Sequence, residues 1–75
     1  MTRQHYEIRV EGHLATDWSD WFDGLAIRQA ATGETVLAGE MDQATLHGIL
    51  AKIRDLGLVL VAVDRLPKPS TLEGR

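Results

Sequence analysis

The clearest pattern in this sequence is a change of hydrophobic period between residues 42 and 63. Apolar residues recur three and four positions apart and form one helical stripe: Leu46, Ile49, Leu50, Ile53 and Leu56. Asp42 precedes the stripe as a favourable N-cap, and Gly57 follows it as a favourable left-handed C-terminal residue. The pattern predicts a helix over about residues 42–56. The apolar run 58–63 that follows predicts a strand covered on both faces.

Three strands are predicted before the helix. Residues 6–11 alternate strictly between apolar and charged side chains, which is typical of a half-buried strand. Residues 25–29 and 35–39 form two further extended segments, separated by the turn sequence Ala31-Thr32-Gly33-Glu34. A Thr-Gly pair between extended segments predicts a short hairpin with Gly33 in the left-handed conformation.

This order of elements predicts a single α+β domain over residues 1–66, followed by a flexible C-terminal tail, 67–75, that begins at a proline. If the segment 17–23 is a shortened first crossover, the chain is a degenerate ferredoxin-like β(α)ββαβ domain with a four-stranded, mainly antiparallel sheet. The first strand would then lie between the third and the fourth. The alternative is a simple antiparallel meander capped by one helix.

The composition restricts the partners that this chain can have. With 75 residues, a net charge of −3 and scattered basic residues, the sequence argues against a nucleic-acid partner. The absence of cysteine excludes disulfides and fits a reducing cytoplasm. The longest apolar run, residues 58–63, is too short to span a membrane, and no signal peptide is visible. We therefore expect a cytoplasmic protein without a cofactor and without a membrane partner.

Oligomerisation is predicted from the same elements. One full helix cannot cover both the sheet and a last strand that is apolar on two faces, so we expect a homodimer in which a second copy supplies the cover. Ala44, Gly48 and Ala51 form a row of small residues along the helix. This row predicts either tight packing of the helix on the sheet or contact between helices across the dimer.

The segment 17–23 contains three of the four aromatic residues of the chain. Trp18, Trp21 and Phe22 have the i, i+3, i+4 spacing that places them on one face of a short helix or turn. The favoured interpretation is that they close the core where a second helix would pack; the other is that they form an interface or ligand surface.

Three aspartates are interleaved with these aromatic residues. Asp17 is expected to cap the short turn, and Asp23-Gly24 to end it. The spacing of Asp17, Asp20 and Asp23 does not match a cation-binding loop, so no metal site is predicted.

No catalytic constellation is visible, and the chain is not expected to be an enzyme. His5, His13 and His47 are too dispersed for a local metal-ligand motif. Neither serine, Ser19 or Ser70, lies in a nucleophile elbow, and the glycines are too widely spaced for a phosphate loop.

Segments across residues 6–66 resemble a family of small bacterial proteins to which no activity is assigned. The resemblance rests on WSDWFDGL, which fits W-x-x-W-F-x-G-L, and on DQATLHGILAKIRDLGL, which fits D-Q-A-x-L-H-G-x-L-x-K-I-R-D-L-G-L. Thr45 occupies the x between A and L of the second motif, where alanine is usual. The positions that the resemblance marks, without a role, are His13, Trp18, Trp21, Phe22, Asp42, Gln43, His47 and Arg54.

These observations predict a non-catalytic protein-interaction or oligomerisation module that uses the aromatic segment and the helix. The alternative is a small-molecule sensor with a pocket at the open face of the sheet or at the dimer seam. Its lining would be Trp18, Trp21, His13, Gln43 and His47. A third possibility is an enzyme with His13 or His47 as general acid–base.

Overall fold

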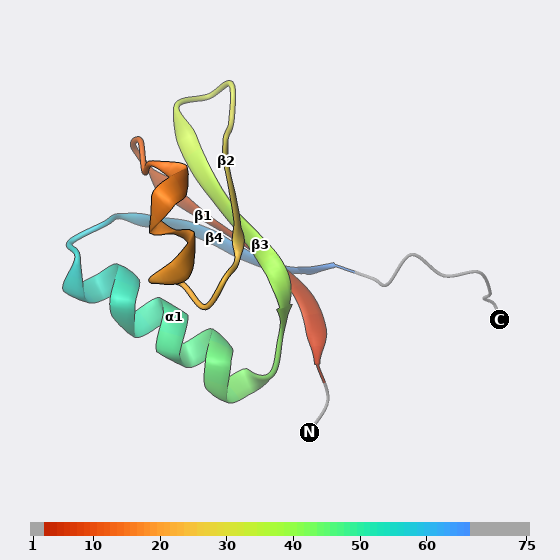
Figure 1. Ribbon diagram of the computed structural model, residues 1–75. Helices are drawn as coiled ribbons and strands as arrows, with labels where there is room; N and C mark the ends of the chain where they lie inside the picture. The colour runs from red at the N-terminus through yellow and green to blue at the C-terminus, as the bar shows by residue number, and fades with distance from the viewer. Residues whose placement is uncertain (1–2, 67–75) are drawn as a thin grey trace, which may run out of the picture.

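The computed structural model describes residues 3–66, which form an α+β fold with a four-stranded antiparallel sheet and one α-helix (Figure 1). The predicted tail, 67–75, lies outside the described residues. The elements in chain order are β1 (Gln4–Glu11), the 3-10 helix η1 (Thr16–Asp20), β2 (Ala26–Gln29), β3 (Glu34–Met41), α1 (Gln43–Asp55) and β4 (Leu60–Leu66).

The strand order is β2-β3-β1-β4, so the first strand lies between the third and the fourth, as predicted. β1 pairs antiparallel with β3, from Gln4↔Met41 to Glu11↔Glu34. It also pairs antiparallel with β4 on its other side. This order is not that of a simple meander, because β1 separates the two strands that α1 connects. β2 and β4 are the two edges of the sheet.

The predicted ends of α1 are confirmed to within one residue. Asp42 is the N-cap, and its side chain accepts a hydrogen bond from the Thr45 amide at 2.8 Å. This hydrogen bond holds the pKa of the Asp42 carboxyl below its usual value. At the other end, Gly57 has φ +74°, its amide donates to the Arg54 carbonyl and the Leu58 amide donates to that of Ile53. These two bonds are the Schellman motif that the position of Gly57 predicts.

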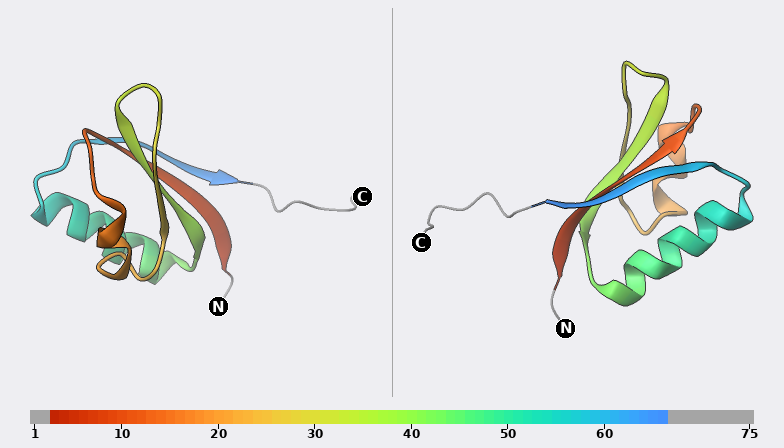
Figure 2. Two further views of the ribbon diagram at one scale, coloured as in Figure 1. Left: turned by 45° about the horizontal axis from the view of Figure 1, so that its top comes forward. Right: turned by 180° about the vertical axis from the view of Figure 1, so that it is seen from behind.

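One face of the sheet is covered by α1 and by the segment that contains η1 (Figure 2). Inward-facing residues of β1 and β3 meet the apolar stripe of α1 and the residues around η1 in a single cluster. Its members are Tyr6, Ile8, Val10, Leu14, Phe22, Leu25, Leu37, Met41, Leu46, Ile49 and Ile53. The alternation in the first strand therefore predicts the core correctly, and the stripe in the helix does so except at Leu56, which is exposed.

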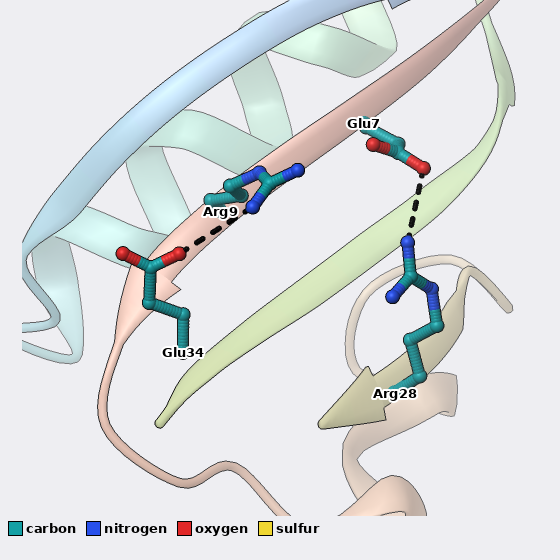
Figure 3. A network of polar contacts seen from close by, with 4 residues as sticks. All are labelled: Glu7, Arg9, Arg28 and Glu34. Carbon is teal, nitrogen blue, oxygen red and sulfur yellow. Dashed lines mark hydrogen bonds and ion pairs between the residues drawn. The ribbon is translucent and has the colours of Figure 1, made fainter. Parts of the chain in front are cut away.

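The opposite face of the sheet needs no apolar cover, because its side chains are largely charged (Figure 3). Arg28 and Glu7 approach to 3.3 Å, and Arg9 and Glu34 to 3.6 Å. Val36 is fully buried between these pairs but lies outside the main cluster. Exposed pairs of this kind add little stability, yet they leave the face well solvated. This face therefore does not require a second copy as cover, and the homodimer stays a prediction.

The last strand also differs from its prediction. It is not covered on both sides: Val59, Leu60 and Val61 are 55%, 45% and 44% exposed. The physical reason is the topology, since β4 is an edge strand and pairs only with β1. The register shifts between Arg9 and Val10 and leaves Val61 as the extra residue of a bulge.

The expected close packing of Gly48 against the sheet is not observed. Gly48 and Ala44 are exposed on α1, and a Cβ added at Gly48 would meet no atom within 4 Å.

We therefore expect Gly48→Ala to stabilise the protein by about 0.5–1 kcal/mol, because alanine is favoured over glycine in a helix interior and loses less entropy on folding. Urea denaturation followed by circular dichroism measures this change. An unchanged or lower denaturation midpoint would mean that Gly48 has a steric role in the protein in solution.

Candidate functional site

The aromatic segment separates into a buried part and an exposed part. Phe22 is fully buried in the core, which confirms the favoured interpretation for this residue. Trp18 and Trp21 are 38% and 49% exposed, so they do not simply close the core. Tryptophan carries a large apolar surface, so two accessible indoles side by side make a local apolar surface. The tryptophan pair is therefore the candidate site.

Backbone hydrogen bonds fix the segment tightly. The Phe22 amide donates to the carbonyls of Trp18 and Ser19, and the Gly24 amide donates to that of Ser19 at 2.8 Å. The Ser19 hydroxyl donates to the Leu25 carbonyl at 2.7 Å. These bonds tie both ends of the turn together, so the tryptophans project from a rigid base.

The ends of the segment are partly as predicted. Asp23 and Gly24 have φ of +59° and +77°, which confirms them as the exit of the turn. The expected role of Asp17 as N-cap is wrong, because the capping position is Ala15 and no side chain caps the turn. Asp17 instead lies within the first turn of η1.

The two indole rings contact each other edge to face. Their centroids are 6.3 Å apart and their planes meet at 86°, which is a favourable geometry for aromatic pairs. Lys52 from α1 holds Trp21 in place. Its ammonium lies 5.3 Å from the centroid of the Trp21 ring and donates to the Trp21 carbonyl at 2.7 Å. The same ammonium is 3.9 Å from the Asp23 carboxylate.

Three acidic residues are interleaved with the tryptophans along the segment. Asp17, Asp20 and Asp23 are all exposed on the segment, and Lys52 is the cation that the structure places against it. The local surface is therefore aromatic and negatively charged. No group of three acidic or histidine side chains within residues 3–66 converges on a common point that could hold a metal ion.

The other predicted site residues lie apart from the tryptophan pair. Gln43, at the start of α1, donates through Nε2 to the Tyr6 hydroxyl at 2.6 Å and so joins the helix to β1. His13 is exposed in the loop after β1, and His47 is exposed on α1. Arg54 forms its ion pair with its neighbour Asp55. Of the predicted residues, the structure brings only Trp18 and Trp21 together as an exposed unit.

Two residues that sequence reasoning missed support this unit. Lys52 is one of several charged residues on α1, and nothing in the sequence links it to Trp21. Thr35 is the buried polar residue beneath the loop before η1. Its hydroxyl accepts from the Leu14 amide at 3.0 Å and lies 2.7 Å from the Gly12 carbonyl. Both roles depend on contacts between residues far apart in the chain, which no local pattern reveals.

The described part of the chain contains no pocket that could enclose a small molecule. No helix within residues 3–66 has the length and apolarity needed to cross a bilayer.

Comparison with known proteins gives one match. A family model described as "Domain of unknown function (DUF8691)" matches residues 5–64, which covers every element of the fold except the first residue of β1 and the last two of β4. The chain matches no curated protein and no solved structure.

Proposed function

We propose that this chain, which belongs to the family described as "Domain of unknown function (DUF8691)", is a non-catalytic protein-interaction module of the bacterial cytoplasm. The tryptophan pair is its docking surface, and the partner is a segment of another protein that combines basic and apolar side chains. The resemblance of the motifs around Trp18 and Asp42 to those of small bacterial proteins supports the bacterial setting, and the absence of cysteine is compatible with the cytoplasm.

One observation carries the proposal: Trp18 and Trp21 are held rigidly in edge-to-face contact while 38% and 49% of their surfaces stay exposed. Exposed tryptophans of this kind are enriched among the residues that dominate binding energy. Because the segment is already ordered by its own hydrogen bonds, a partner would not have to supply the entropy cost of ordering it. The pair is therefore suited to binding, because little conformational entropy is lost when a partner binds to it.

The charge around the pair selects the chemistry of the partner. Three exposed aspartates, Asp17, Asp20 and Asp23, make the rim of the surface negative, so a basic segment is attracted and an acidic one is repelled. Lys52 provides an intramolecular example of the proposed contact, since its ammonium lies over one indole ring and beside one of these aspartates. An arginine or lysine of a partner would meet Trp18 and Asp17 or Asp20 in the same way.

The proposal is tested with two fluorescein-labelled peptides, one of alternating arginine and leucine and one of alternating glutamate and leucine. We expect fluorescence polarisation to show binding of the basic peptide only. Trp21→Ala should weaken this binding by more than about tenfold, because truncating a hot-spot residue costs about 2 kcal/mol or more and about 1.4 kcal/mol corresponds to a factor of ten. Leu56→Ala serves as the control, since Leu56 is an exposed apolar residue (37%) outside residues 17–23.

Circular dichroism confirms that both variants are folded before binding is measured. Equal binding of the two peptides, or equal loss of binding in Trp21→Ala and Leu56→Ala, would contradict the proposed surface.

A further inference from the structure

Lys52 already occupies part of the surface around the tryptophan pair. Its ammonium donates to the Trp21 carbonyl at 2.7 Å and lies 5.3 Å from the centroid of the Trp21 ring. The Asp23 carboxylate is 3.9 Å from the same ammonium. A carbonyl oxygen, an aromatic face and a carboxylate are groups that together recognise an ammonium or a guanidinium ion. Lys52 therefore fills a complete place for a cation, which we call the Trp21 position.

The other indole has similar chemistry but is not engaged by Lys52. Trp18 is 38% exposed and lies in sequence between two exposed aspartates, Asp17 and Asp20. Within residues 3–66, no basic side chain lies over the Trp18 ring or pairs with either aspartate. The two rings are therefore unequal, since the chain itself supplies the cation at Trp21 and a partner has to supply the one at Trp18.

The distance between the rings matches the repeat of an extended peptide. The centroids of the two indoles are 6.3 Å apart. In an extended chain, the side chains of residues i and i+2 point to the same side and are about 6.4–6.8 Å apart, whereas those of i and i+1 point to opposite sides. An extended partner with basic residues at i and i+2 would therefore reach both rings if Lys52 did not fill the Trp21 position.

We propose that Lys52 is a specificity-determining residue of this surface, an inference that rests on the proposed docking function. Because Lys52 fills the Trp21 position, a partner places one cation on the surface, and this cation binds at Trp18. A second basic residue at i+2 finds the Trp21 position occupied and adds nothing to binding there. Lys52 thus sets the number of cations that the surface accepts from a partner.

A purely structural role of Lys52 predicts a different result. Lys52 joins α1 to the end of the aromatic segment, so loss of its ammonium would also loosen Trp21. A loosened Trp21 weakens the binding of every basic peptide alike, whereas an opened Trp21 position favours only a peptide whose second cation reaches it. Two peptides measured on the same variant therefore separate these roles.

The experiment uses two fluorescein-labelled peptides of equal length and charge. One contains arginine–leucine–arginine and the other arginine–arginine–leucine, within the same neutral sequence. Fluorescence polarisation gives the ratio of their two affinities for each chain. In Lys52→Met we expect this ratio to shift about two- to fivefold toward arginine–leucine–arginine relative to the wild type, as one semi-exposed cation–π contact of about 0.5–1 kcal/mol requires.

Arg54→Met is the matched control, because it removes the same charge from an exposed position of the same helix. Residues two apart on a helix do not face each other, so the ratio in Arg54→Met should equal that of the wild type. If the peptides bind but the ratio in Lys52→Met also equals that of the wild type, the proposal is overturned and the docking function stands.

A second measurement needs no peptide, so it tests Lys52 even if the docking function fails. Trp18→Phe leaves Trp21 as the single tryptophan of the chain. Its fluorescence is followed while n-butylammonium chloride replaces sodium chloride at constant ionic strength, after circular dichroism has confirmed that each variant is folded. We expect the apparent affinity for butylammonium to be at least about twofold higher when Lys52→Met is added to Trp18→Phe.

The two measurements distinguish the possible failures. If neither peptide binds any chain but butylammonium binds more tightly after Lys52→Met, the docking function is wrong and Lys52 still fills the Trp21 position. Equal affinities for butylammonium with and without Lys52→Met would overturn the role of Lys52, whatever the peptides do.

Discussion

Phe22→Ala is expected to lower the free energy of unfolding far more than Trp21→Ala, one position earlier. Phe22 is fully buried in the core and Trp21 is 49% exposed. Truncating a buried phenylalanine to alanine costs about 3–5 kcal/mol, from lost burial and from the cavity that remains. A domain of this length has a total stability of roughly 4–11 kcal/mol, at about 0.05–0.15 kcal/mol per residue. The loss is therefore between a quarter and the whole of the stability.

Urea denaturation at 25 °C, followed by far-ultraviolet circular dichroism, measures both variants. Trp21→Ala loses the contribution of its partly buried ring surface. Loss of the contact with the Lys52 ammonium should add only about 0.5–1 kcal/mol, because it is a semi-exposed cation–π interaction. If the two variants lost equal stability, the division of this segment into a core residue and a surface pair would be incorrect.

Thr35→Val is expected to cost about 1–3 kcal/mol, although valine has nearly the same shape and favours strands equally well. The Thr35 hydroxyl accepts a hydrogen bond from the Leu14 amide and lies within hydrogen-bond distance of the Gly12 carbonyl and of the Gln29 side-chain oxygen. Valine would leave the buried Leu14 amide without an acceptor. The free energy of unfolding then falls by the full desolvation cost of that amide.

The same substitution should loosen the loop that leads from β1 into η1. We expect the Leu14 amide to exchange its hydrogen faster in Thr35→Val than in the wild type, by a larger factor than amides of α1 such as that of Ile53. Thr32→Val, an exposed threonine in the hairpin turn, is the matched control. A Thr35 variant as stable as the Thr32 variant would show that the hydroxyl network is not needed.

The regular elements were largely predictable because their signals are local. The alternation of β1, the apolar stripe of α1 and the turn at Gly33 each involve residues close in sequence, and their backbone conformations follow from the side-chain period and from glycine at φ +89°. Asp42 and Gly57 likewise act on backbone groups within one turn of the helix. The α+β class and the central place of β1 follow from this order of elements.

The candidate site was only half predictable. The sequence singled out Trp18, Trp21 and Phe22 together, because their spacing is the same whether they face a core or a surface. Only the tertiary structure separates them, since it places the Phe22 ring against the sheet and α1 and leaves the indoles outside. The structure does not group His13, Gln43 and His47 with the tryptophans, because His13 lies in the loop after β1 and the other two residues lie on α1.

Two further features depend on where elements meet in space. Gly39 leaves room for Leu25, whose side chain would lie 2.6 Å from a Cβ at that position. Lys52 reaches across from α1 to the carbonyl and ring of Trp21. The partners in each of these contacts are separated by more than ten residues, so no local pattern contains them.

The sequence by itself determined the type and order of the elements, the ends of α1 and the buried face of β1, because hydrophobic period and capping act over a few residues. The tertiary structure alone decided which strand became an exposed edge, and which aromatic side chains stayed accessible. Those outcomes depend on strand order and on contacts between distant segments. The apolar run at residues 58–63 illustrates the difference: its sequence determines that it is a strand, and its place beside β1 determines that the strand is exposed.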